Sequence, residues 1–130
     1  MTALRFGFSS LALAVVFGAF GAHFLRDQLS ANSLAAWQTA VLYQFIHSMG
    51  IILTYALQST SYPLGKWQVW INRLLISGIL AFSGSIYVLS TQSLHGLNVH
   101  FLGPITPLGG MCFIAAWTLA AVTCAKKITS

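Results

Sequence analysis

The chain has 130 residues, of which 57% are hydrophobic and 5% are charged, and its single acidic residue is Asp27. A soluble domain of this size cannot cover its surface with so few charges, so the composition predicts an integral membrane protein. The six basic residues occur singly or as one pair at the edges of apolar runs, which is typical of topology signals and does not indicate a nucleic-acid partner.

The first uncharged run, 6–25, is about 30 Å long as a helix and predicts the first membrane crossing. Small residues recur along it at every fourth position: Ser10, Ala14, Gly18 and Ala22. Helices in lipid associate through close van der Waals contact, which small side chains allow, so we expect this row to face a neighbouring helix. His23, close to Arg26, is either an interfacial side chain wetted by water or a functional group.

The second predicted span, 35–58, carries polar residues on one helical face. Their spacing of three or four residues defines the stripe, formed by Thr39, Tyr43, His47, Gly50, Thr54 and Gln58, with Gln44 and Ser48 alongside. His47 lies about 15 Å beyond Trp37, so we expect it near the middle of the membrane. An ionisable residue there is a candidate functional group; the alternative is a neutral imidazole hydrogen-bonded to Tyr43, Ser83 or Tyr87.

The uncharged stretch between Arg73 and Lys126 has about 52 residues, enough for two further spans near 74–92 and 107–125. The third span has a polar strip at Ser83, Tyr87 and Ser90 or Thr91, beside small residues that include Gly84. The fourth follows a Gly- and Pro-rich turn, where we expect Thr106 to cap the helix and Gly110 to pack against a neighbour. This helix start could attract a carbonyl or an anion, or be a sharp re-entry into the membrane.

The sequence thus predicts an all-α fold, a four-helix membrane bundle in one domain over 1–130. The distribution of Lys and Arg places both termini in the cytoplasm. In that orientation only Arg26 lies on the outer side, and the cytoplasmic side has five basic residues: Arg5, Lys66, Arg73, Lys126 and Lys127.

No metal site is predicted. His23 lies about 3 Å from its helix end and His47 about 15 Å from its own, a mismatch of some 12 Å, whereas metal ligands stand about 2 Å from the ion. The same mismatch argues against a shared haem. The predicted spans contain no acidic residue, which disfavours proton-coupled multidrug export.

Four ordered motifs carry a resemblance to a known family: GAFGAH at 18–23, WQTAVLYQFIH at 37–47, FSGSIYVLS at 82–90, and GPITPLGG at 103–110 followed by Trp117. They resemble the YgdD/YwdK-like family, which is similar to a short eukaryotic transmembrane protein. The resemblance implies a four-span protein of the bacterial inner membrane and supplies no activity, substrate or cofactor. The matching positions include His23, Tyr43, Gln44, His47, Ser83, Gly84, Ser85, Tyr87, Thr106, Pro107 and Gly110.

We therefore expect a polar pocket in the outer half of the bundle, formed by His23, Tyr43, Gln44, His47, Ser83, Tyr87 and Thr106. A binding or accessory protein is the favoured function, with a lipid, a quinone or a partner protein's side chain in the pocket. The oligomeric state is left open, and a homo-oligomer is one alternative. A small-solute transporter comes second, because the chain shows neither a repeat between its halves nor a helix interrupted at mid-span. A membrane enzyme comes third, and no catalytic residue is assigned, because no nucleophile, carboxylate pair or redox motif is visible.

Overall fold

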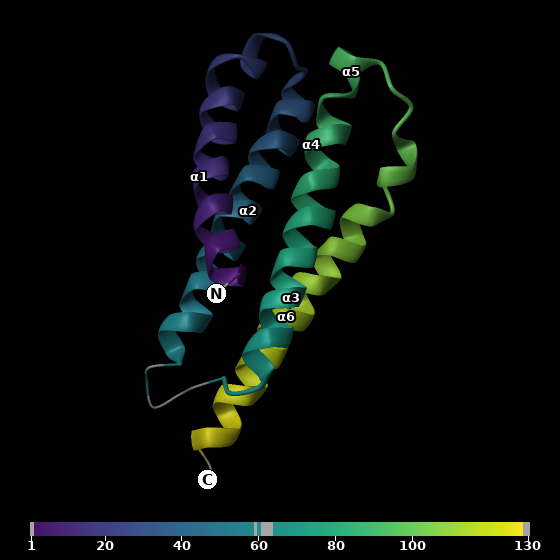
Figure 1. Ribbon diagram of the computed structural model, residues 1–130. Helices are drawn as coiled ribbons and strands as arrows, with labels where there is room; N and C mark the ends of the chain where they lie inside the picture. The colour runs from purple at the N-terminus through teal and green to yellow at the C-terminus, as the bar shows by residue number, and fades with distance from the viewer. Residues whose placement is uncertain (1, 59, 61–63, 129–130) are drawn as a thin grey trace.

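The computed structural model describes residues 2–58, 60 and 64–128, and it shows long helical rods packed along one another (Figure 1). The rods are α1 (Thr2–His23), α2 (Ala31–Leu57), a third that runs through α3 (Trp67–Gly78), η2 (Ile79–Ser83) and α4 (Gly84–Ser90), and α6 (Ile105–Ile128). The described residues thus contain 4 helical segments long and apolar enough to cross a membrane. The prediction of an all-α, four-helix membrane fold is confirmed.

Short helical segments connect the rods at one end of the molecule. They are η1 (Leu25–Asp27), between α1 and α2, and α5 (Gln92–His95) and η3 (His100–Leu102), between α4 and α6. In Figure 1 these connections lie at the top, and both chain termini lie in the lower half. The two termini therefore belong to the same side of the bundle; which side faces the cytoplasm stays a prediction.

All four spans begin earlier along the chain than the apolar runs predict, the first at Thr2 and the fourth at Ile105. The structure gives reasons for the second and the third. The second starts at Ala31 because Ser30 caps it, with the Ser30 hydroxyl accepting a hydrogen bond from the Ser33 backbone N–H at 3.2 Å. The third starts at Trp67, and its first two turns contain Arg73, whose guanidinium lies 5.0 Å from the centre of the Trp70 ring. The predicted start directly after Arg73 is therefore too late, because an arginine can keep its charge at the membrane surface while its helix continues.

Helix α1 packs mainly against α2, and its buried residues are Gly7, Ser10, Ala14 and Gly21. Of the predicted small-residue row, Gly18 is half-buried and Ala22 is exposed. A four-residue step turns a helix by about 400°, so the row from Ser10 to Ala22 drifts by about 120° around α1. A seven-residue step falls only about 20° short of two turns, and Gly7, Ala14 and Gly21 therefore stay on the contact face.

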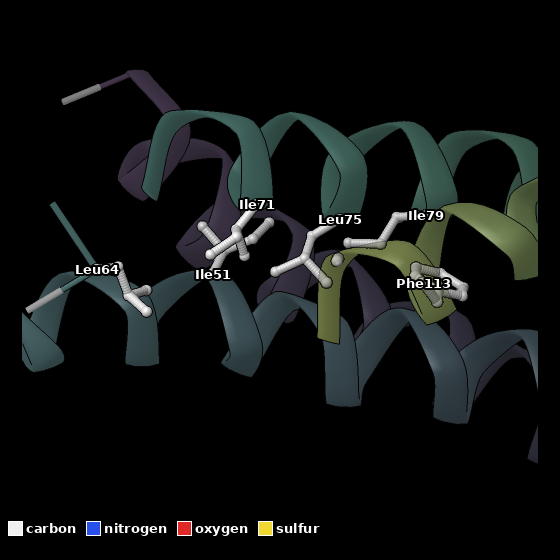
Figure 2. Close-up of a cluster of buried hydrophobic side chains, with 7 residues drawn as sticks. Ile51, Leu64, Ile71, Leu75, Ile79 and Phe113 are labelled. Carbon is white, nitrogen blue, oxygen red and sulfur yellow. The ribbon is translucent and has the colours of Figure 1, made fainter. Parts of the chain in front are cut away.

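The apolar core lies where α2, α3, η2 and α6 meet, and Figure 2 shows its side chains converging from these elements. Ile71, Leu75 and Ile79 follow one another along the third rod, one helical turn apart. The buried members of the core are Ile51, Leu64, Ile71, Leu75, Ile79, Phe113 and Ala116. This core joins α6 to the third rod and to the C-terminal half of α2.

The third rod contains a π-helical turn, η2, that the sequence pattern does not predict. The rod continues through it without a break, but a π turn holds an extra residue and so changes which side chains face each neighbour. At this turn α6 comes within backbone distance of the rod: a Cβ built on Gly109 would lie 2.8 Å from Cα of Phe82. The turn thereby sets the position of Phe82 next to α6.

Candidate functional site

Tyr43 and His47, two of the predicted pocket residues, lie on the side of α2 that meets α6. Nδ1 of His47 is 2.6 Å from the backbone carbonyl oxygen of Tyr43. Because a carbonyl only accepts, Nδ1 carries the hydrogen, and Nε2 of the neutral ring keeps a lone pair. The imidazole also stacks on Phe113 of α6, with ring centroids 3.4 Å apart and planes 14° from parallel. One hydrogen bond and one stacked ring thus fix the orientation of His47.

Beside His47 there is a groove of about 450 Å³ between α2, η2 and α6, called here the α2–α6 groove. It is lined by Tyr43, His47, Phe82, Gly110, Phe113, Ile114, Trp117 and Thr118. The Tyr43 and Phe82 rings stack at a centroid distance of 4.5 Å, and the Trp117 ring lies 6.1 Å from that of His47. Ile114 at its edge is 69% exposed, so in a membrane the groove opens sideways to the hydrocarbon of the lipid.

Glycines on neighbouring helices make room for the aromatic side chains of this groove. A Cβ on Gly50 would lie 2.8 Å from the Trp117 ring, and one on Gly78 would overlap the Phe113 ring. The predicted packing residue Gly84 has open space at that position, and Gly110 has only ordinary contact with Phe82, 3.8 Å away. The close helix contacts of this half of the bundle thus occur at other glycines than Gly84 and Gly110.

Four polar groups, on residues that line the α2–α6 groove, have no hydrogen-bond partner among the residues that the structure describes. They are Nε2 of His47, the Tyr43 hydroxyl, the Trp117 indole N–H and the Thr118 hydroxyl. His47 is only 6% exposed, and it is one of the residues that line the groove. Unpaired polar groups are costly in hydrocarbon, so the groove favours an occupant that supplies both donors and acceptors.

Gln44 and Tyr87 lie elsewhere, in a paired network that joins α1, α2 and α4. The Gln44 amide nitrogen donates to the Ser10 carbonyl oxygen at 2.9 Å, and the Tyr87 hydroxyl donates to the Gln44 amide oxygen at 2.7 Å. The Ser48 hydroxyl donates to that of Ser10 at 2.8 Å. This network borders a smaller cavity of about 250 Å³ next to α1. Because both ends of the Gln44 amide are paired, the network serves as glue between helices.

The remaining predicted pocket residues do not line the α2–α6 groove. Ser83 is buried and donates to the Ala40 carbonyl oxygen at 2.9 Å. The prediction that Thr106 caps α6 is wrong, because the helix begins at Ile105; the Thr106 hydroxyl instead lies 2.7 Å from that of Ser85 and ties α6 to α4. His23 is the exposed last residue of α1, at the connecting end of the bundle.

The aromatic side of the groove was not among the predicted site residues. Phe82, Phe113 and Trp117 are apolar rings in membrane spans, where such residues commonly face lipid, so composition gave no reason to select them. One signal was present: Phe113 and Trp117 are four residues apart and therefore lie on the same face of a helix. Spacing alone could not show that this face meets His47 rather than the bilayer.

Comparisons with known proteins give a consistent result. A family model described as a protein of unknown function (DUF423) matches residues 17–110. A UPF0382 membrane protein of Staphylococcus haemolyticus is 37% identical over 116 residues, covering 89% of this chain and 88% of the relative. The UPF0382 membrane protein YwdK of Bacillus subtilis is 36% identical over 118 residues, covering 89% of each chain. No solved structure matches significantly.

These relatives carry the name membrane protein, and the described residues of this chain contain 4 helices long and apolar enough to cross a membrane. The resemblance inferred from the four sequence motifs is therefore confirmed. The chain is an integral membrane protein of the DUF423 family, and it is similar to the UPF0382 membrane proteins.

Proposed function

We propose that this protein is a binding or accessory protein of the bacterial cytoplasmic membrane, a single four-helix domain with both termini in the cytoplasm. Its α2–α6 groove receives the polar group of a membrane-soluble molecule, such as a lipid or a quinone, or a side chain of a partner. The observation that carries the proposal is His47, an oriented imidazole that lines the groove and whose Nε2 has no partner among the described residues. His47 lies 16 residues after Ala31, about 24 Å along α2 and far from the ends of the span.

Two features support binding over a purely structural role for this histidine. Two polar residues of α2 that hold the helices together are paired: Gln44 with Ser10, and Thr54 with Asn72 at 2.8 Å. His47 uses only one of its two ring nitrogens within the described residues. An ionisable residue placed so deep in a membrane, with one nitrogen free, fits a ligand-binding group better than glue between helices.

Native mass spectrometry of the protein extracted in mild detergent tests the proposal. The wild-type protein is expected to retain a bound molecule. His47→Gln is expected to lose it because the flexible amide lacks the Nδ1 hydrogen bond and the ring stack that hold the imidazole in one orientation. His23→Gln is the matched control, the same replacement at an exposed helix end, and is expected to keep the molecule.

Thermal unfolding followed by circular dichroism establishes that both variants keep the helical fold. The proposal fails if the folded His47→Gln variant carries the same bound mass as the wild type, or if the wild type carries none in native membranes and nanodiscs made from them.

A further inference from the structure

The chemistry of the α2–α6 groove narrows the kind of molecule that fits it. We infer that its occupant is a hydroxylated aromatic ring of the hydroquinone type, held between aromatic side chains, with one ring hydroxyl donating a hydrogen bond to Nε2 of His47. This inference rests on the proposed function, because it specifies the occupant of the same groove.

The shape of the occupant follows from the residues around it. Most of the lining side chains carry rings, and their faces already pair in the structure, His47 on Phe113 and Tyr43 on Phe82. A flat ring can add edge-to-face or offset contacts to these ring pairs, whereas a flexible acyl chain has no comparable orientation preference. The volume of about 450 Å³ lies within the range of about 300–1,000 Å³ that is usual for small-ligand sites.

The direction of the hydrogen bond distinguishes the reduced ring from the oxidised one. Nε2 of His47 is an acceptor, because Nδ1 holds the hydrogen that is donated to the Tyr43 carbonyl oxygen. A hydroquinone hydroxyl donates to such an acceptor, but a quinone carbonyl has only lone pairs to offer. The Trp117 N–H and the Tyr43 hydroxyl can donate to the oxygen atoms of the occupant.

A charged lipid headgroup fits the groove poorly. No lysine or arginine is among its lining residues, so a phosphate placed there would lack a counter-charge far from the membrane surface. A neutral ring with hydroxyl groups and an apolar tail avoids that cost, and its tail can leave through the open side next to Ile114, which is 69% exposed.

The test compares three probes that share one decyl tail: a benzohydroquinone, its dimethyl ether and the corresponding quinone. Binding to purified protein in nanodiscs is measured by equilibrium dialysis under argon, with reductant present for the hydroquinone. We expect the hydroquinone to bind about tenfold more tightly than the ether, because the ether leaves Nε2 unpaired. The quinone is expected to bind no more tightly than the ether.

His47→Phe supplies the decisive variant, because phenylalanine can retain the stack on Phe113 while removing the acceptor nitrogen. It is expected to abolish the tenfold preference and to leave the affinity for the ether unchanged, so that hydroquinone and ether bind equally. The matched control His23→Phe, at an exposed helix end, is expected to keep the full preference.

The outcomes separate this inference from the proposed function. Equal binding of all three probes to the wild type, tighter binding of the quinone, or no binding of any probe overturns the hydroquinone assignment without need of a variant. A preference that survives in folded His47→Phe also overturns it. The proposed function is judged separately, by whether His47→Gln loses the co-purified mass, which can identify a lipid or a partner as the true occupant.

Discussion

The close approach of α6 to the π-helical turn makes Gly109 the position where a single methyl group should have the largest effect. A Cβ at Gly109 would lie 2.8 Å from both Cα and Cβ of Phe82 and would overlap its backbone nitrogen. Backbone atoms cannot move aside as the end of a flexible side chain can, so relief requires α6 and η2 to separate. Gly109→Ala is therefore expected to destabilise the protein.

The magnitude follows from a comparison with Gly84→Ala, where nothing lies within 4 Å of the new methyl group. Both replacements gain the same helix propensity, up to about 1 kcal/mol. The difference between the two variants therefore isolates the clash, and overpacking of this kind costs about 1–3 kcal/mol. Gly110→Ala, with its nearest contact at 3.8 Å, should behave like Gly84→Ala.

Equilibrium unfolding in mixed micelles, with sodium dodecyl sulfate as the denaturant and tryptophan fluorescence as the signal, measures these differences. Each variant is compared with the wild type at the same protein and detergent concentrations. If Gly109→Ala proves as stable as Gly84→Ala, then α6 does not contact the third rod at backbone distance, and the position assigned to Phe82 in the groove is wrong.

Three further predictions concern topology and packing. Reporter fusions near Gly65 should indicate the cytoplasm and one near Asn98 the outside, and the opposite pair of signals would reverse the proposed orientation. Gln44→Leu should lower the unfolding free energy by about 1–2 kcal/mol, because it breaks three interhelical hydrogen bonds; an unchanged value would show that the network adds no stability. Gly21→Ala should be less stable in thermal unfolding than Gly18→Ala. The new methyl group would lie 2.7 Å from the Trp37 ring at position 21, but 3.6 Å from Val41 at position 18. Equal stability would contradict the contact row formed by Gly7, Ala14 and Gly21.

The spans could be predicted from the sequence because uncharged runs of about 20 residues have few alternatives in a chain with so little charge. The pairing of Tyr43 with His47 could also be expected, since residues four apart lie on one helical face. Both conclusions need only local spacing. The helix starts were harder, because Arg73 lies within α3 rather than before it.

The division of the polar residues among different neighbours could not be predicted. Gln44 lies alongside the predicted stripe that contains His47. However, α2 packs against α1 and the third rod and contacts α6 through side chains, and adjacent residues point about 100° apart around its axis. Tyr43 and His47 therefore meet α6, whereas Gln44 meets α1 and α4. The π turn also changes which side chains of the third rod face each neighbour, and helix propensities do not predict such a turn. Phe82, which lies in this turn, lines the groove.

The unpaired polar groups of the groove should also affect the stability of the protein when no ligand is bound. An apolar ring in place of His47 removes a polar nitrogen that has no partner among the described residues, and the Tyr43 carbonyl keeps its helical hydrogen bond when the imidazole is lost. His47→Phe should therefore be at least as stable as the wild type once both have been exhaustively washed with detergent, although it binds its occupant less well. Thermal unfolding of the washed proteins measures this, and re-addition of the occupant should stabilise only the wild type by mass action. A loss of several kcal/mol in the washed variant would instead make the imidazole a structural element, and binding by Nε2 would no longer be needed to explain its presence in the membrane.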